Sequence, residues 1–164
     1  MRKHYGRLAL FEFTVVLLLL LLVYVVCYPG FQKAKSAVYV RNCMGNQQQI
    51  ASLLTMYAVE HGERYPTRWR DAMSGDRTCL SCKEKEIPIS YGCNENILGE
   101  DIRSLGTGMT KANNILLTAD GGNSRHVIET NDDIDKMSHP KGFVASFLDG
   151  HAEYLSPETV VKLR

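Results

Sequence analysis

A single apolar segment near the N-terminus constrains this chain more than any other feature. Leu8–Tyr28 is 21 residues long, and Glu12 is its only charged side chain. As a helix, a segment of this length reaches about 31 Å, close to the thickness of a bilayer core. We therefore expect a membrane-inserted helix at residues 8–28, preceded by a short basic leader at residues 1–7.

Composition places one small domain after this segment. The chain has 164 residues, 45% of them hydrophobic and 23% charged, with a formal net charge of +1. Residues 1–28 hold three of the 19 Lys and Arg and one of the 18 Asp and Glu, so the remainder is nearly neutral. Such a charge gives no electrostatic footprint for nucleic acid. The sequence predicts a hydrophobic anchor joined to one modest domain.

A cleaved signal peptide is the alternative to a retained helix. Signal peptidase needs small residues just after the apolar run, and Val25, Val26, Cys27 and Tyr28 do not supply them. A retained helix is therefore our interpretation. Glu12 is costly inside such a helix and calls for a cationic partner from another chain or a position at the membrane interface.

The amphipathic second half of the helix is predicted at residues 29–62. Its apolar stripe follows a spacing of three and four: Cys43, Gln47, Ile50, Leu54 and Tyr57. Gly62 is a plausible stop, and Pro66 bars continuation. Helix-forming residues resume directly after Pro29, so we expect a bend there and not an end.

The rest of the chain, residues 63–164, reads as an α+β head with a small antiparallel sheet. Strand patterns occur at residues 114–119, 125–130, 143–148 and 152–155. Asp149-Gly150 separates the last two and is a strong hairpin signal. Residues 67–112 lack periodicity and are predicted to be rich in loops, and Ser156-Pro157-Glu158 suggests a short last helix.

The N-terminus resembles that of type IV pilins and type II secretion pseudopilins. In those proteins a basic leader is cut off after Gly, a glutamate stands at mature position five, and a proline tends to stand at position twenty-two. Counting from Leu8 puts Glu12 fifth and Pro29 twenty-second. Here Gly6 is followed by Arg7, so a cut after Gly6 makes Glu12 sixth, and a cut after Arg7 lacks the preceding Gly. Cleavage by a prepilin peptidase and N-methylation are left open.

The C-terminal part resembles the same broad group. Many of its members have a His, nine residues and then Asp-Gly, and this chain has His139, nine residues and Asp149-Gly150-His151. The two ends together make the resemblance specific.

This resemblance implies a pilin-like fold and a structural, non-catalytic role. The subunit would be single-pass in a bacterial inner membrane, with its head in the periplasm. It would associate with copies of itself and with other pilin-like subunits through the N-terminal helix, in a type II secretion or type IV pilus-like fibre. Glu12 would pair with the terminal amine of a neighbour. The alternative, favoured by Gly6-Arg7, is a membrane-tethered binding module that does not polymerise.

Four cysteines outside the apolar segment are candidates for disulfides if the head is extracytoplasmic: Cys43, Cys79, Cys82 and Cys93. We expect at least one bridge among them, with the connectivity open. The alternatives are a zinc knuckle built from Cys79, Cys82 and Cys93 with a histidine, and a redox CxxC. Cys27 lies in the apolar helix and reads as a small hydrophobe.

A metal triad of His139, Asp149 and His151 would make the protein an enzyme. Because Asp149 and Gly150 have a full explanation as a turn, we expect no catalytic site and no enzyme activity.

The polar loop with Asp132, Asp133 and Asp135 offers calcium ligands, as the resemblance to calcium-binding pseudopilins implies. Its alternative is a solvated acidic loop. We therefore expect no resident cofactor, with calcium as the open alternative.

Overall fold

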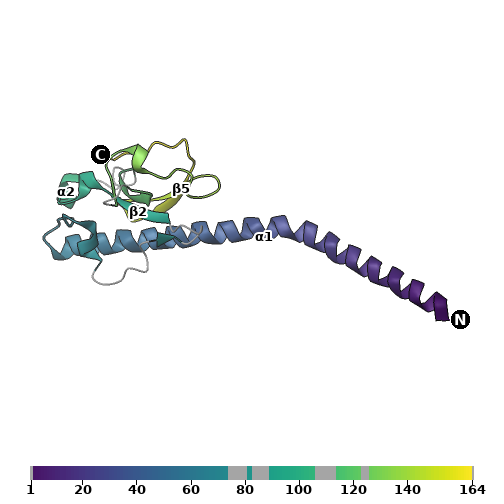
Figure 1. Ribbon diagram of the computed structural model, residues 1–164. Helices are drawn as coiled ribbons and strands as arrows, with labels where there is room; N and C mark the ends of the chain where they lie inside the picture. Colours follow the sequence, from purple (N-terminus) through teal and green to yellow (C-terminus); the bar gives the residue numbers. More distant parts are fainter. Residues whose placement is uncertain (1, 74–80, 83–88, 106–113, 123–125, 164) are drawn as a thin grey trace. The chain divides into compact units, whose positions relative to one another are not determined.

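The computed structural model describes residues 2–73, 81–82, 89–105, 114–122 and 126–163, and for residues 2–9, 81, 82 and 89 it describes the backbone alone. The chain divides into two compact units, Met1–Ala37 and Val38–Arg164. Helix α1, Arg2–Glu60, belongs to both and includes Pro29 (Figure 1). The prediction that the helix continues through this proline is confirmed.

The second part of α1, residues 38–60, buries one stripe of side chains, as its spacing predicts. Cys43, Gln47, Ile50 and Leu54 are fully buried. The helix ends at Glu60, and Gly62 follows with a φ of +71°. Glycine adopts this left-handed conformation at no steric cost, which explains why the chain can leave the helix there.

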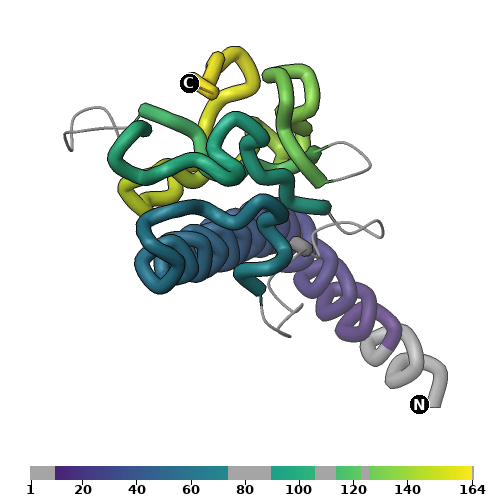
Figure 2. Tube along the Cα trace, turned by 90° about the vertical axis from the view of Figure 1, so that its left-hand side faces the viewer, coloured from purple at the N-terminus to yellow at the C-terminus, as the bar shows by residue number. Residues whose placement is uncertain are grey.

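The head is a small mixed sheet packed along the second part of α1 (Figure 2). Its strands are β1 (Ser81–Cys82), β2 (Ile89–Asn94), β3 (Leu116–Asp120), β4 (Val127–Ile128), β5 (Phe143–Phe147) and β6 (Ala152–Leu155). The strand order is β1-β2-β3-β5-β6, and β4 also pairs with β2. The α+β class is therefore confirmed.

The two faces of the sheet bury different apolar sets. On the face against α1, Tyr91, Cys93, Leu117 and Val144 join the buried stripe of the helix. On the other face, a second cluster contains Leu116, Ala119, Ile128, Phe143 and Phe147. The alternation along β5 follows from the two-residue period of a strand. In β3 a register shift between Leu116 and Thr118 interrupts it, so that Leu117 and Ala119 lie on opposite faces.

The prediction of an antiparallel sheet is wrong in one place, because β4 runs parallel to β2. Cys93 pairs with Thr118 of β3 and with Val127 of β4, so these strands lie on opposite edges of β2. Just after β3, Gly122 lies close to Gly92 of β2, since a Cβ on Gly92 would lie 2.8 Å from the Cα of Gly122. β4 lies on the edge of β2 opposite β3, beyond the part of β2 that pairs with β1, and it runs in the same direction as β2.

Strand β2 also corrects the prediction for residues 67–112. It lies inside this segment, yet it is an inner strand of the sheet, with pairing partners on both of its edges. The described residues of this segment also include three short helices: η1 (Trp69–Ala72), η3 (Glu95–Ile97) and α2 (Ile102–Leu105). Its sequence, Ile-Ser-Tyr-Gly-Cys-Asn, mixes the apolar residues of a strand with residues that strands avoid.

The hairpin of β5 and β6 forms where Asp149-Gly150 predicts it. Gly150 has a φ of +89°, which this turn requires. The predicted helix at residues 156–158 is wrong, because the chain makes only a turn there. It then extends so that the Lys162 carbonyl accepts a hydrogen bond from the Leu116 amide at 2.8 Å. A last short helix, η4, spans Asn131–Asp133.

Candidate functional site

The first unit, Met1–Ala37, contains the first part of helix α1, whose described side chains up to Tyr28 are apolar around almost the whole circumference. The large apolar residues from Leu10 to Tyr28 are between 40% and 68% exposed. A helix of this kind is stable in lipid or against other apolar helices, and not in water. By length and composition it could cross a membrane or serve as a signal sequence.

Glu12 is an exposed carboxylate within this apolar surface. Among the side chains that the structure describes, none forms a hydrogen bond or ion pair with it. Thr14, by contrast, donates to the Phe11 carbonyl oxygen at 2.8 Å and so satisfies its own hydroxyl. Gly6, Arg7 and Leu8 have helical backbone, and their side chains lie outside the described set. A carboxylate in an apolar environment therefore needs a partner from outside this unit.

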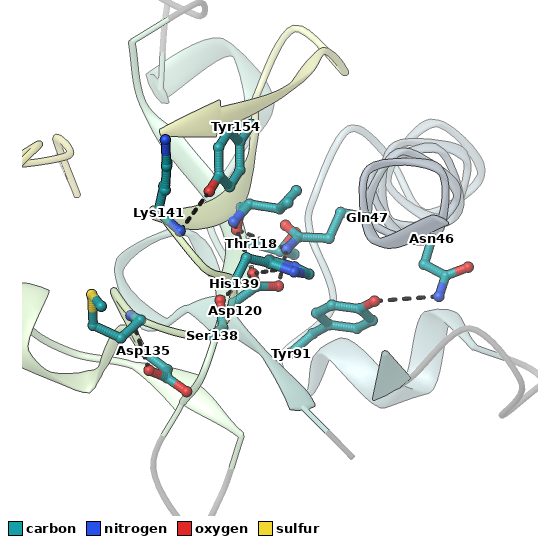
Figure 3. Close-up of polar contacts among 12 residues, drawn as sticks. Asn46, Gln47, Tyr91, Thr118, Asp120, Asp135, Ser138, His139, Lys141 and Tyr154 are labelled. Carbon is teal, nitrogen blue, oxygen red and sulfur yellow. Dashed lines mark hydrogen bonds and ion pairs between the residues drawn. The ribbon is translucent and has the colours of Figure 1, made fainter. Parts of the chain in front are cut away.

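The head contains a buried polar cluster around Asp120, at the end of β3 (Figure 3). The Asp120 side chain is fully buried. Its Oδ2 accepts hydrogen bonds from the Ser138 hydroxyl at 2.7 Å and the Val144 amide at 2.8 Å. Its Oδ1 accepts a hydrogen bond from Nε2 of Gln47 at 2.9 Å. One carboxylate thus joins α1, β3, β5 and the segment before β5.

Gln47 makes the complementary contacts from the helix. Its Nε2 also donates to the Val144 carbonyl at 2.8 Å, and its Oε1 accepts from the Thr118 hydroxyl at 2.9 Å. The hydroxyls of Thr118 and Ser146 lie 2.6 Å apart. Because the Gln47 amide and the Thr118 hydroxyl each have more than one hydrogen-bond partner, the cluster avoids the free-energy cost of burying unsatisfied polar groups.

The structure separates the roles of the predicted His-x9-Asp-Gly-His residues. His139 is buried, with Nε2 3.3 Å from Oδ2 of Asp120. Asp149 and His151 form their own pair on the hairpin turn, where Nδ1 of His151 lies 2.5 Å from Oδ1 of Asp149. His151 also stacks on Phe147, with ring centroids 4.5 Å apart.

This separation does not support the metal-triad alternative. In the described part of the chain, no three His, Cys, Asp or Glu residues lie close enough together to hold a metal ion. His139 instead packs its ring edge toward Tyr154, at a centroid distance of 6.2 Å. The phenol oxygen of Tyr154 accepts a hydrogen bond from the Lys141 amide at 3.1 Å. The His139 amide donates to the Gly142 carbonyl at 3.0 Å, and the Gly142 amide donates back to the His139 carbonyl at 3.3 Å, so the backbone of His139 closes the turn that leads into β5.

The acidic loop uses its carboxylates to hold its own backbone. Oδ2 of Asp133 accepts hydrogen bonds from the amides of Glu129 and Thr130, both at 2.9 Å. These bonds hold the pKa of the Asp133 carboxyl below its usual value. Oδ1 of Asp135 accepts from the Met137 amide at 3.1 Å, and Asp132 is exposed. The calcium candidates are thus not gathered around one point.

The candidate cysteines fall into three groups. Cys43 is disulfide-bonded, and the side chain of its partner lies outside the described residues. Cys93 is a free, fully buried thiol. The prediction of Cys93 as a disulfide or zinc-knuckle candidate is wrong, because its free thiol packs in the apolar core between sheet and helix. Burial raises its pKa, so the thiol stays protonated. Cys79 and the side chain of Cys82 lie outside the described residues.

A groove of about 450 Å³ lies between the end of α1 and the turn of the β5–β6 hairpin. Met56, Val59 and Leu148 give it apolar walls, and Glu60 and Asp149 place carboxylates at it. Its remaining lining residues are Ser52, Thr55 and Gly150. No pattern in the sequence predicts this groove, because its two sides are almost ninety residues apart in the chain.

No protein-family model, no curated protein and no solved structure matches this chain.

Proposed function

We propose that this protein is a structural, non-catalytic, pilin-like subunit. The first part of α1 anchors it in a bacterial inner membrane and packs against other copies in a type II secretion or type IV pilus-like fibre. One observation carries the proposal: a single helix is apolar all round in its first part and amphipathic in its second, where a small sheet covers one stripe. Such a helix has two separate uses, burial against lipid or other helices and support of a head.

The cysteines support an extracytoplasmic position for the head. Cys43 is disulfide-bonded, and such bonds persist in oxidising compartments such as the periplasm. With the head outside, the basic leader at residues 1–7 lies on the cytoplasmic side, as short basic flanks prefer. Both signals agree on a single-pass topology.

Glu12 gives the assembled helices their register in this proposal. An unpaired carboxylate is costly away from water, so it favours the one alignment in which a cation of a neighbouring copy meets it. The terminal amine of a processed neighbour is that cation in our proposal. A leader that stays attached removes the amine and with it this role.

The test replaces Glu12 by Leu and compares membrane insertion with assembly. We expect Glu12→Leu to insert as well as the wild type and to lose fibres, measured by membrane fractionation and by electron microscopy of sheared surface material. Thr14→Val is the matched control, because Thr14 lies on the same helix and satisfies its own hydroxyl. Unchanged fibres in Glu12→Leu remove the role of Glu12.

The alternative function is a membrane-tethered binding module that does not polymerise. The order Gly6-Arg7 favours it, because the family has Gly directly before the cut. Mass spectrometry of the N-terminus separates the two. A start at Arg7 or Leu8 supports the fibre subunit, and an intact Met1 supports the tether.

A further inference from the structure

The side of α1 opposite the sheet carries a set of exposed residues in the second unit. By helical spacing they lie opposite the buried stripe: Val38, Arg41, Gly45, Ser52, Met56 and Val59. We call this set the outer face. Its three apolar side chains, Val38, Met56 and Val59, are 55%, 58% and 68% exposed. In the described part of this unit, the outer face is left open to a partner.

Gly45 lies in the middle of the outer face without a reason in the fold of one chain. A Cβ at this position would meet nothing within 4 Å, and the backbone is helical. Glycine lowers the stability of a helix interior relative to alanine. Its missing side chain therefore leaves room for something outside the chain.

Two opposite charges lie at the two ends of this surface. Arg41 and Glu60 are both exposed, and neither forms an ion pair within the described part of the chain. They are 19 residues apart on one helix, about 28 Å along its axis, so they cannot meet within one copy. Glu60 also ends the helix, where the helix dipole disfavours an acid. Its charge is thus unfavourable for the chain alone.

The groove beside Glu60 is suited to bind another helix. Its apolar walls, Met56, Val59 and Leu148, continue the outer face onto the β5–β6 turn. The carboxylate of Asp149 at the same turn adds to the acidic character of this end. A helix with small and apolar residues and one positive charge would complement this groove. Residues 38–45 of α1 form such a helical segment, with Arg41 as the positive charge.

We propose that the groove binds residues 38–45 of a second copy, whose α1 runs parallel and is displaced by 18 or 19 residues. The inference rests on the proposed function, since the helices of subunits stacked in one fibre run parallel and are displaced along its axis. Eighteen residues are five helical turns, so the outer faces still meet, at a displacement of about 27 Å. Val38 of the second copy then lies at Met56, and its Arg41 lies at Glu60. Its Gly45 leaves room for the turn that follows α1.

The test places a photoreactive benzoylphenylalanine at Met56 in the full-length protein, in cells that assemble the fibre. We expect a covalent dimer whose crosslinked peptide contains residues 38–45 of the second copy. A crosslink to another part of the chain, to lipid or to a different protein overturns the proposed docking. So does a fibre that forms without this crosslink, and that result leaves the proposed function intact. A chain that stays monomeric overturns both.

Charge reversal tests the ion pair between copies. We expect Glu60→Arg to reduce the crosslink about fivefold, because an exposed attraction becomes a repulsion. Glu60→Arg combined with Arg41→Glu restores it. The matched control is Glu158→Arg, an exposed acid away from the groove, which leaves the yield unchanged. Equal losses in Glu60→Arg and Glu158→Arg, or no rescue by the double variant, contradict the pairing.

Discussion

Gln47 of α1 donates a hydrogen bond to Asp120 of β3 at 2.9 Å, and both side chains are fully buried. Apolar packing alone tolerates several alignments of a helix on a sheet, since it is non-directional. A buried amide and a buried carboxylate have one alignment in which both are satisfied. We interpret this pair as the contact that fixes which turn of α1 faces β3.

Replacing Gln47 by Leu tests this interpretation. The variant leaves Asp120 with fewer donors and removes the partner of the Val144 carbonyl. We expect the free energy of unfolding to fall by about 3 kcal/mol, because buried polar groups lose their partners. Urea unfolding of the protein in detergent micelles, followed by the fluorescence of buried Trp69, measures the change.

The matched control for Gln47→Leu is Gln48→Leu, which changes an exposed residue on the next position of the helix. We expect it to change stability by less than about 0.5 kcal/mol. Similar losses in the two variants contradict a special role for Gln47.

Two glycines are predicted to respond in opposite directions to alanine. A Cβ on Gly142 would overlap the carbonyl oxygen of Leu155 on β6, so Gly142→Ala should destabilise the head by about 1–3 kcal/mol. A Cβ on Gly45 meets nothing within 4 Å, so Gly45→Ala should stabilise it by about 0.5–1 kcal/mol. The same unfolding measurement decides. A destabilised Gly45→Ala monomer contradicts the open outer face.

The capping carboxylate of Asp133 predicts a pH dependence. Hydrogen bonds from two backbone amides hold its pKa below the ordinary value of 3.8. Its contribution to stability is therefore complete above pH 3.8 and is lost as the pH falls through the lowered pKa. Asp133→Asn should be less stable than the wild type at neutral pH, and the difference should close in acid.

Asp132→Asn is the control for this pH series, because Asp132 is exposed and its carboxylate makes no such bonds in the described part of the chain. Its unfolding free energy should follow that of the wild type at every pH. A gap for Asp133→Asn that stays constant in acid contradicts the assignment.

The Cys93 thiol is predicted to be inert in the folded protein. It is fully buried, and burial raises its pKa, so almost no thiolate forms near neutral pH. Iodoacetamide should leave Cys93 unmodified in the native state and modify it after denaturation, as peptide mass spectrometry would show. Cys27 is exposed and free, and serves as the internal reference in detergent. Rapid native labelling of Cys93 contradicts its place in the core.

Local patterns were enough to predict much of this fold. The stripe from Cys43 to Leu54 repeats every three or four residues, and a helix buries such a stripe whatever it packs on. The turn at Asp149-Gly150 is also local, because the positive φ it needs favours these residue types. Both predictions are confirmed.

Long-range pairing accounts for what the sequence did not show. Strand β2 lies in a segment with weak periodicity, and it forms a strand because it pairs with β3 and β4. Asp120 looks like part of a turn with two glycines, yet it accepts hydrogen bonds from Gln47, 73 residues away. The spacing of His139 to Asp149 likewise gave no sign that His139 lies beside Asp120.

Cys27 is a natural probe of the proposal that the first part of α1 packs against other copies in the membrane. It is free and exposed on the apolar helix, whereas Cys43 is bonded and Cys93 is buried. We would treat membranes that hold the full-length protein with membrane-permeant bismaleimides of several lengths. We expect a covalent dimer that disappears in Cys27→Ala and is weakened in Glu12→Leu. A chain that stays monomeric with every linker would contradict it.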